Sequence, residues 1–225
     1  MATLSELRTR IANKLSDGEL LRPNSAQIDQ AVNAAIDFYE NKYFWFQESV
    51  AALTTTAGSG GLSSLPTDFK FQVHPNSLVL LKNNDRYELE HISASQFDAI
   101  ANDVSNGLPR YYTYRDGAFE ITPLADDTYT VNLYYYKSYV DLVDDADEND
   151  FTNYATRLIE YKTLLDLIED YKPEDARQAT YSIKVKEEYQ TIENETYNRT
   201  ATGKIVGENI AEYDDSKYYY YRRNY

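Results

Sequence analysis

The spacing of apolar residues changes twice along this chain. In residues 3–47 they recur at intervals of three and four, which is typical of one stripe of a helix. In residues 50–138 they alternate with polar residues or form short runs between turn signals, which is typical of strands. Helical spacing returns in residues 150–198. The pattern predicts an α+β fold: a bundle of about four helices, two N-terminal and two C-terminal, with a central antiparallel β meander and an extended C-terminal tail.

Capping residues predict where the N-terminal helices begin. Thr3 lies three residues before Glu6, the spacing of a capping box, so the first helix is expected to begin there. Asn24 or Ser25 is the expected N-cap of a second, long helix. That helix is expected to end in the aromatic cluster at residues 43–46, whose rings would fill a core beneath the sheet. The alternative is that the cluster forms an exposed patch for a partner.

Two further helices are expected in the C-terminal part. The first is marked by helically spaced apolar residues: Phe151, Tyr154, Leu158, Leu165 and Ile168. Pro173 suits the first position of the second helix, where no backbone N–H is needed. That helix carries two weak apolar rows, Ala176-Thr180-Ile183 and Val185-Tyr189-Ile192. We expect one row to face its own domain and the other to face a neighbouring subunit.

Turn signals in the middle of the chain predict hairpins. Asp116 and Gly117 separate two strand-like runs, which is a strong short-range hairpin signal. Residues 83–85, Asn-Asn-Asp, predict another turn after a buried strand at residues 78–81. A further strand is expected at residues 128–137, where apolar residues alternate. Because short turns join the strands, we expect the sheet to be antiparallel.

The charge balance limits the possible partners. The chain has 22 basic and 37 acidic residues, a formal net charge of −15. Nucleic-acid-binding proteins neutralise phosphates with Lys and Arg, so a tight DNA or RNA binder is not expected. The charge suits a surface past which double-stranded DNA slides without specific binding; the alternative is that it only keeps the protein soluble. Residues 141–150 are strongly acidic but lack the glycine of a calcium loop, so we expect a solvated loop there.

Residues that carry out catalysis are scarce. The only histidines are His74 and His91, and there is no cysteine. Two carboxylate pairs can be nominated for glycoside hydrolysis: Glu40 with Glu48, and Glu160 with Asp166. Any acidic chain supplies such pairs by chance, so we expect no enzyme, no cofactor and no metal site. No apolar run reaches signal-peptide or membrane-spanning length, so we expect a soluble protein made in the cytosol with no membrane partner.

Tyrosine is unusually abundant, with 23 residues against one tryptophan. This surplus exceeds what a single core absorbs, so many rings are expected at contacts between chains. Residues 201–225 end in a segment rich in the residue types that anchor interfaces: Tyr213, Tyr218, Tyr219, Tyr220, Tyr221, Arg222, Arg223 and Tyr225. We expect an extended docking arm for another protein or subunit. The alternative is an ordinary frayed terminus.

Several segments, taken in order, resemble the head-to-tail adaptor proteins of tailed phages, also called connector or head-completion proteins. IDQAVNAAIDFYE at residues 28–40, followed by YFWFQE at 43–48, resembles the family's helix of the form ID.AI..AI.FY and its aromatic cluster. LPTDF at residues 65–69 resembles the family's LP.DF step into the sheet. The remaining matches are GLPRYY at 107–112, ITP at 121–123 and the strand at 129–136. The similarity spans roughly residues 3–198.

The resemblance implies a structural virion protein. Residues 1–200 would form the adaptor domain, with helical parts 3–47 and 150–198 and a β-rich part 50–138. Residues 201–225 are the part least covered by the resemblance, and their role as a docking arm follows from their residue types alone. A ring, typically of twelve copies, would sit between the portal protein and a tail or nozzle protein at the neck of the virion, after assembly in the host cytoplasm. It would extend the DNA channel and provide the surface for tail attachment. The alternatives are a tail-completion or nozzle subunit and, less favoured, a peptidoglycan-cleaving virion enzyme.

Overall fold

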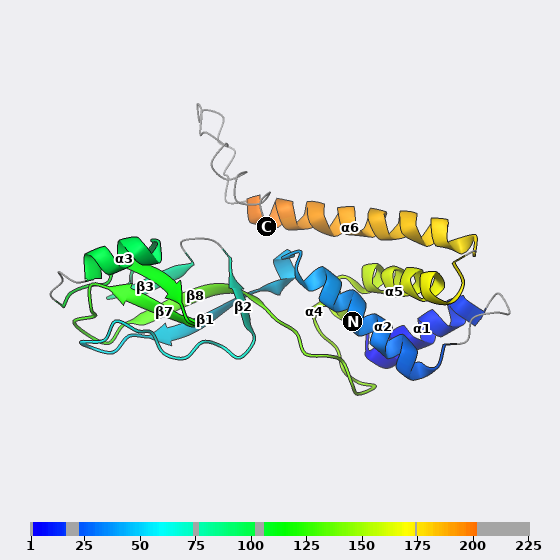
Figure 1. Ribbon diagram of the computed structural model, residues 1–225, viewed down its shortest axis with the longest axis horizontal. Helices are drawn as coiled ribbons and strands as arrows, with labels where there is room; N and C mark the ends of the chain where they lie inside the picture. Colours follow the sequence, from blue (N-terminus) through cyan, green and yellow to red (C-terminus); the bar gives the residue numbers. More distant parts are fainter. Residues whose placement is uncertain (1, 17–22, 74–76, 102–105, 174, 202–225) are drawn as a thin grey trace, which may run out of the picture.

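The computed structural model describes residues 2–16, 23–73, 77–101, 106–173 and 175–201. The molecule is elongated, with a helical lobe and a β lobe side by side along its long axis (Figure 1). The helical lobe combines the N-terminal and C-terminal parts of the chain, and the β lobe is formed by the middle part. The predicted α+β class is confirmed.

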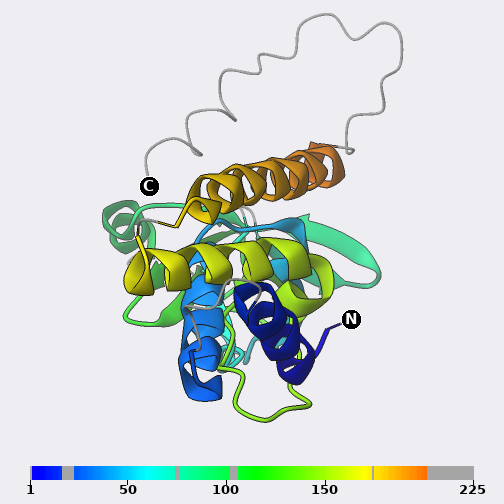
Figure 2. The same cartoon turned by 90° about the vertical axis from the view of Figure 1, so that its right-hand side faces the viewer.

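The helical lobe is built around one helix. Its elements are α1 (Leu4–Ser16), α2 (Ser25–Glu40), the 3-10 helix η1 (Trp45–Gln47), α4 (Asp150–Tyr154), α5 (Thr156–Tyr171) and α6 (Arg177–Ala201). Helix α5 contacts α1, α2 and α6, and it lies between α6 on one side and α1 and α2 on the other (Figures 1 and 2). The predicted four-helix bundle is not confirmed in that form, because the expected third helix is two helices, α4 and α5, separated at Ala155.

The helix starts follow the capping residues in part. The Glu6 N–H donates to Thr3 Oγ1 at 3.3 Å, as predicted. Asn24 is the N-cap of α2: its side chain accepts from the Gln27 N–H at 2.9 Å, and the Gln27 side chain accepts from the Asn24 N–H at 2.9 Å. Each cap satisfies backbone N–H groups that have no partner within the helix. Helix α2 ends at Glu40, before the aromatic cluster that it was predicted to reach.

The prediction that Pro173 occupies the first position of the last helix is wrong. Helix α6 begins at Arg177, and the side chain of Asp175, in the turn before it, caps the helix start. The Asp175 carboxylate accepts from the Arg177 N–H at 2.9 Å and pairs with its guanidinium at 2.7 Å. Hydrogen bonds from Arg177 lower the pKa of Asp175 to about 2. This local ion pair fixes the helix start more strongly than the proline upstream of it.

The β lobe contains two sheets and one helix. A five-stranded sheet has the order β1-β8-β3-β4, with β2 also pairing β8; its strands are β1 (Glu48–Thr54), β2 (Phe69–Gln72), β3 (Leu78–Lys82), β4 (Asp85–Glu88) and β8 (Thr130–Lys137). A three-stranded sheet has the order β5-β6-β7; its strands are β5 (Glu90–His91), β6 (Tyr111–Arg115) and β7 (Ala118–Thr122). Helix α3 (Ala94–Ala101) contacts β6 and β7.

The predicted meander is replaced by a sheet centred on β8. This strand pairs antiparallel with β1 along one edge and with β3 along the other, where β2 continues the same edge. It suits the central position because Val131, Leu133 and Tyr135 are all buried. Among the strands that the structure describes, only β3–β4 and β6–β7 are joined as local hairpins, and β5 pairs parallel with β6. The strands of the larger sheet therefore pair mostly through contacts distant in sequence.

Both predicted turns are present. Asn83 and Asn84 have φ of 52° and 68°, and Asp116 and Gly117 have φ of 50° and 74°. Two successive residues with positive φ form the type I′ turn that matches the twist of a hairpin. Asn, Asp and Gly tolerate this region of φ better than other residues.

We expect Gly117→Ala to destabilise the protein by about 1 kcal/mol, because a Cβ at positive φ is strained. A Cβ at this position would meet no atom within 4 Å, so no steric clash contributes. The loss of stability then measures the backbone strain alone. The matched control is Gly107→Ala, where φ is not positive and the nearest atom, Pro123 Cβ, lies at 3.9 Å. Chemical denaturation of both variants measures the difference; equal losses would show that the turn is not the cause.

Each lobe has its own apolar core. The helical core includes Leu7, Ile11, Val32 and Phe151, and the β core includes Leu78, Leu80 and Tyr112, each of these fully buried. Apolar burial on this scale is the dominant stabilising term in a domain of ordinary size. Because neither core extends across the junction, the position of one lobe relative to the other depends on contacts outside the two cores.

Candidate interaction surfaces

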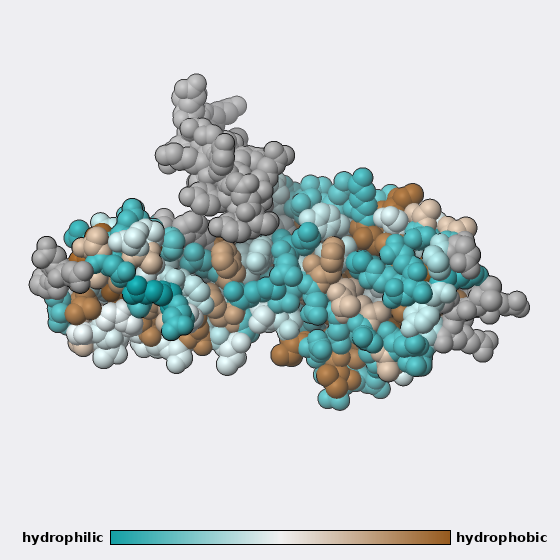
Figure 3. All heavy atoms as spheres, viewed as in Figure 1, coloured by the Kyte–Doolittle hydropathy of each residue, from teal (hydrophilic) through white to brown (hydrophobic). Residues whose placement is uncertain are grey.

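The outer side of α6 is exposed along its length. Its inward row packs into the helical core: Val185, Tyr189 and Ile192. Of its predicted second row, Thr180 and Ile183 are exposed on the helix, and Ala176 is exposed in the turn just before it. The prediction that one row faces its own domain is therefore confirmed. Ile183 is 60% exposed and Tyr197, on the same side near the far end, is 55% exposed. Brown, hydrophobic atoms are visible over the start of α6 along the upper edge of the helical lobe (Figure 3).

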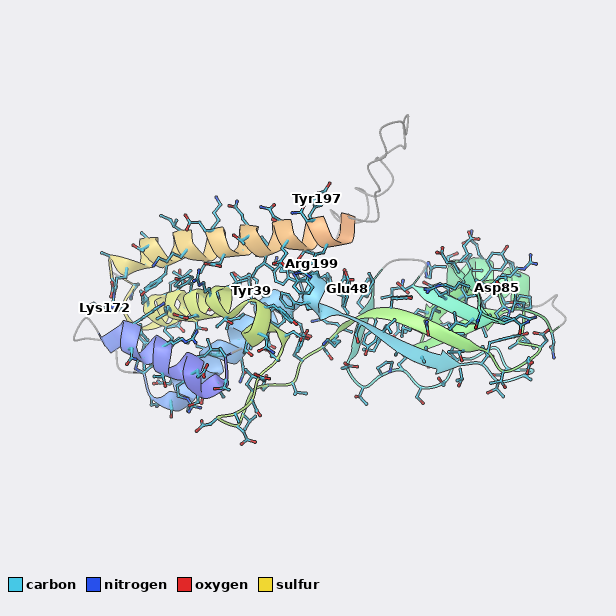
Figure 4. The ribbon with its side chains drawn as sticks, turned by 180° about the vertical axis from the view of Figure 1, so that it is seen from behind. Tyr39, Glu48, Asp85, Lys172, Tyr197 and Arg199 are labelled. Atoms are coloured by element: carbon cyan, nitrogen blue, oxygen red, sulfur yellow. The ribbon has the colours of Figure 1, made fainter. Side chains whose placement is uncertain are left out.

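The C-terminal end of α6 is held against η1. The Arg199 guanidinium lies 3.6 Å from the centre of the Trp45 ring and pairs with Glu195 at 2.7 Å. The backbone N–H of Trp45 donates to Thr196 Oγ1 at 3.3 Å. Arg199 points towards η1 whereas Tyr197 points away from the lobe (Figure 4). The point at which residues 202–225 leave α6 is thus fixed near the junction of the two lobes.

Removing the Arg199 guanidinium is expected to loosen the end of α6. A cation–π contact contributes about 0.5–2 kcal/mol, so Arg199→Ala should speed amide exchange in the last turns of α6 by roughly fivefold. The control is Arg157→Ala; the Arg157 side chain is 75% exposed, and its guanidinium lies 3.8 Å from Glu188. Hydrogen exchange read by mass spectrometry distinguishes the two variants. Unchanged exchange in Arg199→Ala would show that the Trp45 contact does not hold the helix end.

The aromatic cluster at residues 43–46 is mainly core. Phe44 and Phe46 are 2% and 5% exposed, and both rings contact Phe151. The core interpretation is confirmed, but its predicted location beneath the sheet is wrong, because these rings lie in the helical core. Tyr43 has a positive φ of 57°, and the chain turns there. As a result the centre of its ring lies 4.9 Å from the centre of the Tyr136 ring of β8. The turn explains how one short segment serves both the helical core and the lobe junction.

Ion pairs join the two lobes. Glu40, at the end of α2 and nearly buried, pairs with Lys70 of β2 at 3.1 Å and accepts from the Tyr139 N–H at 3.3 Å. Lys137 of β8 pairs with Asp150 of α4 at 2.5 Å, and the Tyr139 hydroxyl donates to the same carboxylate at 2.8 Å. Burial, together with the hydrogen bond to Asp150, raises the pKa of Tyr139. Breaking a partly buried pair leaves an uncompensated charge, so these contacts restrain how the lobes are oriented.

The carboxylates nominated for hydrolysis are used in structural contacts. Besides Glu40, the pairs are Glu160 with Lys14, Asp166 with Lys162 at 2.5 Å, and Glu48 with the Tyr136 hydroxyl at 3.4 Å. Burial raises the pKa of Asp166, which the neighbouring lysine partly offsets. His91 is exposed beside the Tyr112 ring, and His74 lies outside the described residues. Within the described ranges, no three acidic or histidine side chains gather in a way that could hold a metal ion.

The segment at residues 138–149, between β8 and α4, forms an acidic loop with a fixed conformation. Leu142 is buried, and its N–H and C=O both bond the Asn33 side chain at 3.0 Å. Val140 and Val143, on either side of it, are 89% and 75% exposed. The Asp147 carboxylate accepts from the Val143 and Asp144 N–H groups at 2.8 Å. These hydrogen bonds lower the pKa of Asp147.

Arg8 ties this acidic loop to both N-terminal helices. Its guanidinium makes two hydrogen bonds of 2.8 Å to Asp29 of α2 and one of 2.6 Å to Asp145 of the loop. The Leu4 N–H of α1 donates to the Asp147 backbone oxygen at 3.0 Å. The two carboxylates raise the pKa of Arg8. The acidic residues predicted only a solvated loop here; Val140 and Val143, beside and within the acidic run, are the signal that the loop also presents apolar side chains.

The predicted docking residues lie outside the described part of the chain. They are Tyr213, Tyr218, Tyr219, Tyr220, Tyr221, Arg222, Arg223 and Tyr225. The structure describes α6 as far as Ala201, so these docking residues stay a prediction.

Comparison with known proteins covers nearly the whole chain. Residues 2–223 match the family described as SU10 adaptor protein. The match extends beyond the resemblance at residues 3–198 and includes most of the tyrosine-rich C-terminal segment. No curated protein matches the chain. Among the described helices, none is long and apolar enough to cross a membrane. The resemblance to phage head-to-tail adaptors is confirmed, and the chain belongs to the SU10 adaptor protein family.

Proposed function

We propose that this protein is a non-enzymatic head-to-tail adaptor of a tailed phage. About twelve copies form a ring between the portal and the tail. A ring forms when the same head-to-tail contact between subunits repeats around an axis and closes on itself. The ring extends the DNA channel and presents the surface on which a tail or nozzle protein assembles. The observation that carries this proposal is the family match over residues 2–223. The protein assembles in the host cytoplasm and resides at the neck of the virion.

The surfaces of the helical lobe support a role in assembly. The outer side of α6 and the acidic loop expose apolar side chains that the single chain leaves uncovered. Exposed valine and isoleucine at fixed positions gain free energy only when another surface covers them. In a ring each subunit binds beside others that are already in place, which raises the effective concentration of its binding partners. Contacts that are weak individually therefore give a stable assembly.

The domain arrangement follows the same scheme. Residues 1–200 act as the adaptor domain, and residues 201–225 act as an arm that docks on the portal or on an adjacent subunit. In the arm, the tyrosine rings from Tyr213 to Tyr225 are anchors, and Arg222 and Arg223 pair with carboxylates of the partner. Helix α6 supports this because its last turns are anchored at Trp45, which gives the arm a defined origin.

The net charge of −15 supports passage of double-stranded DNA without specific binding. A channel wall with the same sign of charge as the phosphates repels DNA and does not retain it. Electrostatic mapping of the assembled ring should give an acidic lumen. A basic lumen would reject this explanation of the charge.

Co-purification distinguishes the proposal from its alternatives. An adaptor is retained by portal protein, whereas a tail-completion or nozzle subunit is retained by the tail tube. Retention by the tail tube alone would refute the adaptor role. A peptidoglycan-cleaving enzyme would clear a peptidoglycan gel; because Glu40, Glu160 and Asp166 are all paired with lysines, we expect no clearing.

A further inference from the structure

Two exposed apolar surfaces lie on opposite sides of the helical lobe. Helix α6 forms the upper side and the acidic loop at residues 138–149 the lower side, with α5 and the N-terminal helices between them (Figures 1 and 2). Hydrophobic atoms appear at the lower edge of this lobe as well as over α6 (Figure 3). A contact that repeats in one direction needs two different surfaces facing apart, and these two surfaces meet that condition.

The loop surface combines apolar and negative groups. Val140 and Val143 stand beside Asp141 and Asp144, which are exposed and form no ion pair within the described residues. Asn33 and Arg8 hold the loop from behind, so the two valines are presented by a pre-ordered backbone. Little conformational entropy is therefore lost in ordering the loop when a partner binds here.

The first half of α6 combines apolar and positive groups. Between Arg177 and Lys186 the helix has no acidic residue; Arg177 is paired with Asp175, so Lys184 and Lys186 supply the positive charge, and Glu187 and Glu188 follow directly after them. Ile183 is 60% exposed, and Lys186 is exposed with no ion pair within the described residues. Lys184 lies over the rings of Tyr161 and Tyr181, at 5.1 and 5.7 Å, so its charge is directed towards α5, and Lys186 is the basic residue that accompanies Ile183 on the outer side. This surface matches the loop in both hydrophobicity and charge.

We propose that the first half of α6 in one copy packs on the acidic loop of the next copy. Ile183 covers Val140 and Val143, and Lys186 pairs with Asp141 or Asp144. The occupant of each surface is a second copy of this chain, because one chain carries both complementary halves on opposite sides. Charge complementarity of this kind sets the direction and register of a contact. The inference rests on the proposed ring and specifies which surfaces build it.

Cysteine cross-linking tests which residues meet. The chain has no cysteine, so introduced thiols are the only ones present. In assemblies on portal, the double variant Val143→Cys/Ile183→Cys treated with a short bismaleimide should give a ladder of linked chains in a denaturing gel. Either single variant alone should give none, because position 143 meets position 183 and not its own equivalent. The control is Val143→Cys/Ile100→Cys, in which the second thiol replaces a 39% exposed residue of α3 in the β lobe.

Charge exchange tests the pairing independently. Lys186→Glu alone and Asp141→Lys/Asp144→Lys alone should each raise the concentration needed for assembly by about tenfold or more, since like charges then meet. Mixed in equal amounts, the two variants should assemble again as alternating rings, which native mass spectrometry identifies by equal numbers of each chain. All substituted side chains are exposed, so circular dichroism of each variant should match the original protein.

The outcomes separate this inference from the proposed function. A ladder together with rescue by mixing supports the contact. If the unmodified protein forms a ring on portal but neither result is obtained, the contact is wrong and the adaptor role stands. A link between the cysteine at 143 and portal protein would assign the loop to portal and overturn the inference. If the unmodified protein neither binds portal nor forms rings, the proposed function fails, and this contact with it.

Discussion

Deleting residues 213–225 is expected to leave a folded protein that no longer attaches to portal-bearing heads. The described helices, strands and both cores lie within residues 2–201, so the truncation removes no core contact that the structure describes. It does remove six tyrosines and two arginines, the residue types that dominate binding energy at interfaces. Loss of several such anchors should weaken attachment by more than about a hundredfold.

Co-sedimentation of the truncated protein with portal-bearing heads measures this loss. A matched variant replaces residues 218–221 with phenylalanine, which keeps the rings and removes the hydroxyls; it should retain most of the attachment. A second variant replaces the same four tyrosines with serine and should behave like the truncation. Attachment of the truncated protein at the normal level would show that residues 213–225 are not a docking arm.

Phe44→Ala is expected to destabilise the helical lobe by about 3–5 kcal/mol, as truncation of a buried ring typically does. Phe44 is 2% exposed. The centre of its ring lies 5.4 Å from that of Phe46, 5.9 Å from that of Tyr189 and 6.3 Å from that of Phe151. Removing it leaves a cavity among several aromatic side chains that cannot all move to fill it. Because Phe44 lies just before the junction of the lobes, the loss should also weaken their connection.

Fluorescence of Trp45 reports this unfolding directly. It is the only tryptophan of the chain and its ring lies 5.7 Å from Phe46, inside the same cluster. The control is Phe38→Ala, since Phe38 is 52% exposed on α2 and its loss should cost less than about 1 kcal/mol. Equal shifts of the denaturation midpoint in both variants would contradict the assignment of residues 43–46 to the core.

Local signals in the sequence predicted local structure well. The capping residues Thr3 and Asn24 and the turn at Asp116 and Gly117 involve partners within a few residues of one another. Their geometry depends on side-chain and backbone preferences that the sequence states directly. The two rows on α6 were also predicted, because helical periodicity separates an inward from an outward face.

Features that depend on distant contacts were not predicted. Strand β8 takes the centre of its sheet by pairing with β1, about eighty residues earlier, which no turn signal indicates. The helix start at Arg177 was missed for a different reason: its ion pair with Asp175 is local, but Pro173 is the stronger signal of a helix start in the sequence. The break at Ala155 was missed because helical periodicity continues through it. The link between Glu40 and Lys70 joins two lobes that were treated separately.

The candidate surfaces were predicted unevenly for the same reason. The exposed row on α6 follows from periodicity, whereas the exposure of Val140 and Val143 follows from how Asn33 and Arg8 hold the loop. Apolar residues within an acidic run give no indication of their orientation until the backbone is fixed. Once it is fixed, the two valines are exposed at defined positions, which is the observation behind the proposed contact.

Electron microscopy of the purified protein mixed with portal protein tests the central claim most directly. We expect a closed ring of copies of this chain, coaxial with the portal, with α6 of each copy against the acidic loop of the next. Portal particles that carry no added density, or density for this chain only on the tail tube, would contradict it.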